Sequence, residues 1–406
     1  MSNVEGKSVA TRRLRRPLWA RSLCAWADRI VAGQLAIRFP DGSAHHAQGA
    51  LPGPSAIIHV RSGRLVWKLA TGGSLGFARA YIDGDWDSPD LGAVLQLGLA
   101  NEAALAAVLN APGLARLVAF LKHRLRANTR AGSRRNIAFH YDLGNDFYRL
   151  WLDETMTYSS AMFHRDDLTL AEAQRAKYAR IVEALELGPK DHVLEIGCGW
   201  GGFAEYAATE AGCRITALTL SREQAGFARE RLAAAGLSDR VEIRLQDYRD
   251  CVGRFDKIVS IEMFEAVGEE NWPTYFDALR ALLKPGGRAM VQSITIAEER
   301  FDNYRRNADF IQTYIFPGGM LPSPTAFAAA ATERGLKVLE RKFFGADYER
   351  TLLAWDRAFV AAWHRIEALG FDARFKRMWR YYLHYCATGF RHGTIDVCQF
   401  QLAPEG

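Results

Sequence analysis

A glycine-rich turn follows an apolar run in residues 193–202, whose letters are VLEIGCGWGG. Glycines leave this backbone open to a ligand because no Cβ stands in the way, and the helix predicted after the turn offers free amides to a carboxylate or phosphate. The spacing differs from the G-x-G-x-x-G of dinucleotide sites, and a carboxylate within the strand could accept from an amino group. We therefore predict an S-adenosylmethionine site; the alternative is a tight turn without a ligand. The predicted contacts are Glu195, Gly197, Gly199 and Gly201.

Polar residues also follow the next two predicted strands. The carboxyl ends of parallel strands meet at one edge of a sheet, so these residues would surround the same crevice. Asp247 could accept from an adenine amino group, and the ribose hydroxyls would meet neutral partners after the second strand. Taken singly, each is an ordinary loop residue. The predicted cofactor contacts here are Thr219, Leu220, Ser221, Gln224, Gln246 and Asp247.

These loops belong to an alternating series of strand and helix patterns. Thr169 and Glu172 form a capping box at the start of a helix that ends before Gly188. The alternation after this helix predicts a parallel, doubly wound α/β sheet of the Rossmann-like kind. The predicted strands are 192–196, 214–218, 241–245, 255–261, 288–293, 336–344 and 394–402, and the predicted helices are 203–211, 222–235 and 272–283.

The length of 406 residues favours two domains. Residues 1–126 mix strand patterns with the segment GFARAYIDGDW and predict a small α+β domain. A linker over 127–139 then leads to a second domain over 140–406, in which residues 297–335 form an insertion that would cover the ligand crevice. The predicted strands of the first domain are 34–39, 56–60 and 65–69.

Composition excludes several classes of protein. Apolar residues are 49% and charged residues 24% of the chain, which is typical of a globular protein. No run approaches the roughly 18 apolar residues of a membrane-spanning helix, and no apolar segment follows the N-terminal arginines as in a secretory signal. The six cysteines form no CxxC pair, which predicts reduced thiols and no metal site. These features indicate a cytoplasmic enzyme.

The positive charge is concentrated in the first third of the chain. Residues 1–135 hold 19 Lys and Arg against 8 Asp and Glu, whereas residues 136–406 hold 33 against 38. Two basic runs, 7–21 and 122–135, indicate an anionic partner, although each alone could be a solvated segment. No nucleic-acid-binding motif accompanies them. We therefore expect peripheral binding to the inner face of the cell membrane, and no nucleic acid.

Many ordered segments from about residue 140 onward resemble cyclopropane-fatty-acyl-phospholipid synthases. These segments are HYDLGNDFY, TYSSAMF, LEIGCGWGG, TLSREQ, LQDYRD, MFEAVG, IFPGGMLPS, FGADYERTLLAW and RYYLHYCATGFRHG. The N-terminal GFARAYIDGDW is similar to the small lipid-engaging domain of full-length bacterial members. The resemblance implies a class I S-adenosylmethionine methyltransferase that alkylates the cis double bond of an unsaturated phospholipid acyl chain. It places Tyr158 and Ser159 at the cofactor and His140 and Tyr141 at the substrate.

The resemblance also implies a base site. In the family, a bicarbonate ion held by a Cys, a Glu, a His, a Tyr and a backbone amide removes a proton after alkylation. The matching positions are Ser160, Glu265, Gln292, Tyr348 and the amide of Ile294, so two side chains depart from the family pattern. Bicarbonate could remain, but the imidazole is gone. We therefore place a methylene or methyl branch slightly ahead of a cyclopropane as the product.

Cys386 matches a family cysteine once regarded as a nucleophile, and the alternative is a small apolar side chain on an aromatic-rich helix. Two other functions stay open: a methyltransferase of a small amine, and a non-catalytic lipid-binding homologue. The basic N-terminal half argues against the first, and the unbroken cofactor motif argues against the second. A homodimer is one open form of assembly.

Overall fold

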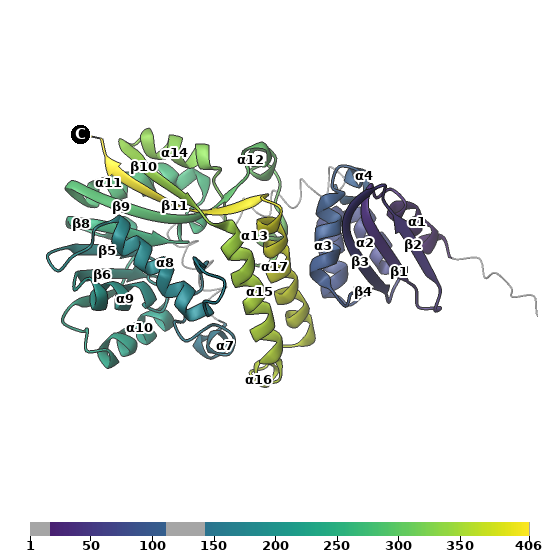
Figure 1. Ribbon diagram of the computed structural model, residues 1–406, viewed down its shortest axis with the longest axis horizontal. Coiled ribbons are helices and arrows are strands. Elements are labelled where there is room, and N and C mark those ends of the chain that lie inside the picture. Colours follow the sequence, from purple (N-terminus) through teal and green to yellow (C-terminus); the bar gives the residue numbers. More distant parts are fainter. Residues whose placement is uncertain (1–16, 111–142, 406) are drawn as a thin grey trace, which may run out of the picture. The chain divides into compact units, whose positions relative to one another are not determined.

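The computed structural model describes residues 17–110 and 143–405, which fall into two compact units divided between Ala111 and Pro112. Figure 1 shows both units with their helices and strands labelled. The predicted linker 127–139, the substrate residues His140 and Tyr141, the basic run 122–135 and most of the run 7–21 lie outside the described residues.

The N-terminal unit has the predicted α+β architecture. Its sheet has the order β2-β1-β3-β4, in which β1 is parallel to β3 and antiparallel to β2. The strand predicted at 65–69 is wrong, because these residues begin helix α2; a short apolar run fits either structure, and here the helical pattern continues to Ile82. The elements are α1 (Leu18–Ala27), β1 (Ala32–Arg38), β2 (Ala44–Gln48), β3 (Leu51–Val60), α2 (Arg64–Ile82), β4 (Trp86–Asp87), α3 (Leu91–Ala100) and α4 (Ala106–Leu109).

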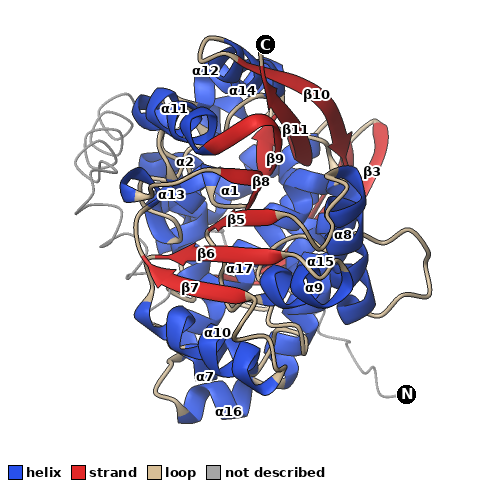
Figure 2. Cartoon of the chain, turned by 90° about the vertical axis from the view of Figure 1, so that its left-hand side faces the viewer, coloured by secondary structure: helices blue, strands red, loops and turns tan. Residues whose placement is uncertain are grey.

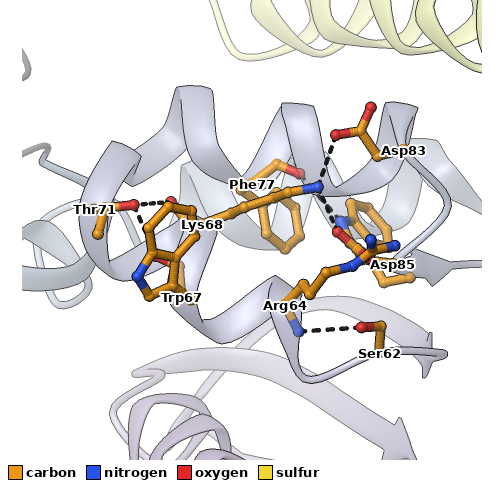
Figure 3. A network of polar contacts seen from close by, with 9 residues as sticks. Ser62, Arg64, Trp67, Lys68, Thr71, Phe77, Asp83 and Asp85 are labelled. Carbon is orange, nitrogen blue, oxygen red and sulfur yellow. Dashed lines mark hydrogen bonds and ion pairs between the residues drawn. The ribbon is translucent and has the colours of Figure 1, made fainter.

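An ion-pair cluster joins the start of α2 to the turn before β4. Figure 3 shows Arg64 and Lys68 reaching from α2 toward Asp83 and Asp85. The Asp85 side chain is fully buried and accepts from Arg64 Nε at 2.8 Å and from Lys68 Nζ at 2.6 Å. Lys68 also donates to Asp83 at 2.7 Å. The acidic residues of GFARAYIDGDW therefore tie the end of α2 to its own first turn.

The C-terminal unit contains a seven-stranded sheet in the order β10-β11-β9-β8-β5-β6-β7. Figure 2 shows β5 between β8 and β6. Strands β5 to β9 are parallel, but β11 is antiparallel to both β9 and β10, which corrects the all-parallel prediction. The reason is the connection between β10 and β11. Helices α15 and α17 run side by side, so the chain leaves the end of β10 and comes back to the same end of the sheet before β11 begins.

The predicted ranges 192–196, 241–245 and 255–261 coincide with β5, β7 and β8, and the Thr169–Glu172 capping box is present. The elements of this unit are α7 (Asn145–Arg149), α8 (Leu170–Ala184), β5 (His192–Ile196), α9 (Gly202–Glu210), β6 (Arg214–Thr219), α10 (Arg222–Ala234), β7 (Val241–Leu245), β8 (Phe255–Ile261), α11 (Trp272–Leu282), β9 (Leu283–Ile296), α12 (Glu298–Tyr304), α13 (Phe310–Tyr314), α14 (Pro324–Thr332), β10 (Leu336–Phe343), α15 (Gly345–Ala361), α16 (Trp363–Ala368), α17 (Ala373–Arg391) and β11 (Ile395–Pro404). Short 3-10 turns lie at Tyr248–Asp250, Phe264–Ala266 and Glu269–Asn271.

Two apolar cores cover the two faces of this sheet. Helices α8, α9 and α10 pack around one core, which includes Val193, and α11 and α14 pack around the other, which includes Leu194. Neighbouring strand residues point to opposite faces, so a sheet buried on both sides needs apolar residues at successive positions. The doubly wound prediction is confirmed in this respect.

The predicted insertion over 297–335 is not one covering segment. Its last part is α14, where the buried Phe327 stacks on Phe400 of β11 with ring centroids 4.0 Å apart. Before α14, the amide of Met320 donates to the Glu265 carbonyl at 2.8 Å. The part that reaches the predicted site is therefore shorter than expected.

Candidate active site

A cavity lies at the carboxyl ends of β5, β6, β7 and β8, where the sequence predicted a crevice. Two predicted residues are absent from its lining. Gly201 caps α9, where a Cβ would lie 3.1 Å from Ala228, and Ser221 caps α10 by accepting from the Gln224 amide. The predicted cofactor residues that line the cavity are Tyr158, Ser159, Glu195, Gly197, Gly199, Thr219, Leu220, Gln224, Gln246 and Asp247.

The glycine turn after β5 has the backbone conformation that its residues require. Gly197 and Gly199 have φ values of 85° and 52°, in the left-handed region that favours glycine. A Cβ on Gly197 would lie 2.9 Å from Met263 Cγ, whereas a Cβ on Gly199 would meet no atom within 4 Å. Gly199 therefore faces open space, as a ligand that lies against the turn requires.

Glu195 is a buried carboxylate beside this turn. Its Oε2 atom has no hydrogen-bond partner, and burial raises the pKa of the side chain to about 8 against the opposing charges of Arg231 and Lys177. A free carboxylate oxygen and an open glycine turn fit S-adenosylmethionine, whose amino group needs an acceptor. Asp247 is less free, because Arg249 donates to both of its oxygens at 2.9 and 2.7 Å.

Glu262, directly after β8, holds a carboxylate of the cavity lining that accepts three hydrogen bonds. Its Oε1 accepts from the Ser160 amide at 2.8 Å and from Gln292 Nε2 at 2.8 Å. Its Oε2 accepts from the Tyr348 hydroxyl at 2.6 Å. The residue has a φ of 51°, which is uncommon for a side chain other than glycine. Three predicted base-site residues therefore meet at a carboxylate that the sequence analysis did not single out.

A chain of side chains sets the direction of the Gln292 amide. Arg180 can only donate, and it donates to Gln399 Oε1 at 2.6 Å. Gln399 then donates through Nε2 to Gln292 Oε1 at 3.0 Å, which leaves the Gln292 amino group to donate to Glu262. Arg180 is held in turn by Glu340 at 2.6 Å. The guanidinium therefore determines which end of the Gln292 amide faces Glu262.

Glu265 lies one 3-10 turn beyond Glu262 and is also partly buried. Its Oε1 accepts from the Ile294 amide at 2.5 Å, and its Oε2 has no hydrogen-bond partner. Burial and the charge of Glu262 raise the pKa of Glu265 to about 8. Two carboxylates this close do not both ionise readily, and Glu262 has more donors to stabilise its charge. The charge of this pair is therefore better stabilised on Glu262 than on Glu265.

Comparisons with known proteins identify the family of this chain. Residues 128–400 match the sequence profile of the family described as mycolic acid cyclopropane synthetase. The chain belongs to this family. It is 40% identical to a tuberculostearic acid methyltransferase of Mycobacterium tuberculosis, over 97% of this chain and 94% of the relative. It is 39% identical to a cyclopropane-fatty-acyl-phospholipid synthase of Escherichia coli strain K12, over 85% of this chain and 87% of the relative.

A solved structure supports the fold and the cofactor. The crystal structure of a mycolic acid cyclopropane synthase complexed with SAH and CTAB is 34% identical and has a TM-score of 0.63, covering 66% of this chain and 97% of that one. As a member of this family, the protein is an S-adenosylmethionine-dependent methyltransferase that methylates or cyclopropanates lipid acyl chains. Its sheet is that of a class I enzyme.

Two residues, Ser160 and Cys386, do not make the contacts that the resemblance predicted for them. The Ser160 hydroxyl donates to the carbonyl of Ala161 at 2.9 Å, so its amide and not its side chain contacts Glu262. Cys386, in α17, is not among the cavity-lining residues. Burial and the charge of Asp309 raise the pKa of its thiol, which keeps it protonated and a poor nucleophile.

Lys177 is a second residue of the site that the sequence analysis did not single out. This fully buried side chain donates to Ser159 Oγ at 2.6 Å and to Gln174 Oε1 at 2.7 Å. Burial lowers its pKa to about 7 against the charges of Glu262 and Glu195. Glu262 was open to prediction, because it directly follows a predicted strand as other crevice residues do, but Lys177 lies within the periodic pattern of a helix.

Among residues 17–110 and 143–405, no cluster of His, Cys, Asp and Glu could hold a metal ion. No helix in the same residues is long and apolar enough to cross a bilayer.

Proposed function

We propose that this protein alkylates the cis double bond of an unsaturated phospholipid acyl chain and that its main product carries a methylene branch rather than a cyclopropane ring. One observation carries this proposal: the cofactor cavity is continuous with a carboxylate whose donors are all neutral, with Gln292 in place of an imidazole. The 40% identity to a tuberculostearic acid methyltransferase supports a branched product. A saturated methyl branch would need a separate hydride donor.

The chemistry demands positioning more than activation. S-adenosylmethionine supplies an electrophilic methyl group when bound. An alkene is a weak, neutral nucleophile, so the chain's residues must hold the double bond in line and exclude water from the cation that forms. Tyr158 lines the cavity, donates or accepts at 2.8 Å with Tyr382, and packs 5.2 Å from the Trp355 ring. This aromatic wall keeps water away from that side of the cavity.

The test is product analysis with vesicles of a monounsaturated phospholipid and S-adenosylmethionine. We expect acyl chains heavier by 14 mass units, with NMR signals of an exocyclic methylene exceeding those of cyclopropane protons. The matched saturated phospholipid should give no product, because it lacks the nucleophile. Cyclopropane as the main product would overturn the branched assignment. Methylation of a small amine with unmodified lipid would overturn the lipid substrate.

We also propose that the basic N-terminal part binds an anionic membrane surface at the cytoplasmic face. The support is the charge of residues 1–135, at up to about 1 kcal/mol per Lys or Arg near such a surface. Reversing Arg124, Arg126, Arg134 and Arg135 to Glu should weaken sedimentation with anionic vesicles, more at low salt than at high. Neutral vesicles are the control, and unchanged binding of the variant to anionic vesicles would refute the proposal.

A further inference from the structure

We propose that Glu262 is the proton acceptor of the reaction and that its carboxylate occupies the place of a separately bound anion. This inference rests on the proposed function for its substrate, but the occupied anion site can be tested without any substrate.

Three carboxylates line the cavity among the described residues: Glu195, Asp247 and Glu262. Arg249 holds both oxygens of Asp247, and a cation so placed removes most of the basicity of a carboxylate. Glu195 lies on β5 beside the glycine turn, where the cofactor is expected. Glu262 follows β8 and lines the same cavity, and by elimination we assign it to the acyl chain.

The contacts of Glu262 suit a base. A carboxylate offers about four lone-pair positions, and the three donors from Ser160, Gln292 and Tyr348 fill three of them. One position remains for an incoming proton. Burial raises the pKa of Glu262 against these donors and against the charge of Lys177, which strengthens it as a base.

The backbone of Glu262 has a conformation that is typical of residues at functional sites. Its φ of 51° lies in the left-handed region, and its amide donates to the Gln292 carbonyl at 2.8 Å. Non-glycine residues in this region are uncommon and collect at functional sites. A glycine would adopt the same backbone more easily, so the fold itself does not ask for a glutamate here.

The groups that the resemblance assigns to bicarbonate are already used by the chain's own carboxylates. Ser160, Gln292 and Tyr348 donate to Glu262, and the Ile294 amide donates to Glu265. Each group of that set therefore already donates to a carboxylate of the chain, and we infer that Glu262 takes the place of bound bicarbonate. Glu265 is not the acceptor, because it does not line the cavity and its Oε1 is held by the Ile294 amide.

The proposed step balances without a further reagent. After transfer of the methyl group, the acyl chain carries a positive charge on carbon. One C–H bond of the added methyl group breaks and its proton passes to the Glu262 carboxylate. The electron pair of that bond forms a C=C bond in the methylene product, following a hydride shift, or a C–C bond in the cyclopropane. The carboxylic acid then releases the proton to solvent.

The first experiment measures anion binding to the cofactor-free protein, with ¹³C-bicarbonate and formate as probes followed by NMR. Glu262→Gly removes the carboxylate and leaves its three donors, so we expect this variant to bind both anions. Wild type and Glu262→Gln should bind neither, because the side chain fills the space in both. Bicarbonate binding to wild type with the affinity of Glu262→Gly would overturn the proposal.

The second experiment measures turnover in buffer freed of carbon dioxide. Wild type should be unaffected by added bicarbonate, and both variants should lose a hundredfold or more in rate. Formate or bicarbonate should restore Glu262→Gly at least tenfold but not Glu262→Gln, the matched control in which the amide blocks the space. Glu262→Gln within threefold of wild type would also overturn the proposal.

Two checks separate the possible failures. Calorimetry should give cofactor affinities within about threefold of wild type for both variants, which shows that the fold is intact. If wild type forms no lipid product at all, the proposed function fails, while the anion-binding result still decides whether Glu262 occupies the anion site.

Discussion

The two units of this protein each hold a carboxylate by several hydrogen bonds, and the partners of these carboxylates differ. Asp85 in the N-terminal unit accepts from Arg64 and Lys68, which are both cations. Glu262 in the C-terminal unit accepts from an amide, a carboxamide and a phenol, which are all neutral. A cation within hydrogen-bonding distance stabilises the charge and makes the carboxylate structural, whereas neutral donors hold it in place and leave it basic.

The largest effect is expected in the cavity of the C-terminal unit, at Gly199 of the predicted cofactor turn. We expect Gly199→Val to reduce S-adenosylmethionine affinity at least a thousandfold, because the side chain would enter the open space beside the turn at a φ of 52°. Calorimetry measures the affinity. Gly236→Val is the control: its φ is 69°, it also faces open space, and it lies outside the cavity, so it bears the same backbone strain. Equal affinity in both variants would contradict this role.

Asp85→Asn tests the structural side. The change removes the buried acceptor of both cations, although Lys68 keeps Asp83 and Arg64 is mostly exposed. We therefore expect a loss of about 2 kcal/mol in the N-terminal unit with cofactor affinity unchanged. Hydrogen exchange of amides in α2 and β4 reports the local free energy of opening. Asp83→Asn, whose side chain is more exposed, should cost about 1 kcal/mol or less. Equal losses from the two changes would mean that burial of Asp85 adds nothing.

Asp356 is a carboxylate of the C-terminal unit that is paired with cations. It therefore tests whether the hydrogen-bond partners, and not the unit, determine how readily a carboxylate ionises. Arg380 donates to both of its oxygens and His384 contacts it at 3.0 Å. Although burial opposes the charge, these partners lower the pKa of Asp356 to about 2.

An unfolded aspartate has a pKa of about 3.9, so Asp356 contributes stability that is full above that value and is lost as the pH falls toward 2. The contribution is about 2 kcal/mol. Thermal unfolding at several pH values between 6 and 2 should show a steeper acid loss for wild type than for Asp356→Asn. Parallel curves for the two proteins would mean that the ion pairs of Asp356 do not contribute to stability.

Glu195 gives the smallest expected effect. Its pKa of about 8 means that it must lose a proton before it can pair with the amino group of the cofactor, so affinity should rise with pH between 6 and 7.5, by no more than about tenfold per pH unit. This carboxylate also interacts electrostatically with four other groups, which are Arg231, Lys177, Tyr178 and Cys198. Because Lys177 titrates in the same range, Glu195→Gln is the control, and calorimetry should show its pH dependence reduced. An unchanged dependence would assign the proton to another group.

Local patterns were sufficient for much of the architecture. The strands 192–196, 241–245 and 255–261 were predicted at their observed limits, because a strand buried on both faces is a short apolar run between turn residues. The cofactor turn was recognisable because residues 197, 199 and 201 have positive φ values, which favour glycine. The same locality explains the error at 65–69, where five residues fit a strand and the following residues continue as a helix.

Tertiary structure decided the chemistry of the base site. The donors of Glu262 lie 102, 30 and 86 residues away in sequence, so no local pattern could show that they meet at one carboxylate. The exchange of roles at Ser160, where the amide and not the hydroxyl makes the contact, depends on a backbone position that residue identity does not reveal. The sequence by itself determined where the strands end and which side chains follow them, because these depend on neighbouring residues. Which of those side chains keeps a free lone pair was decided by the three distant segments that fold against it.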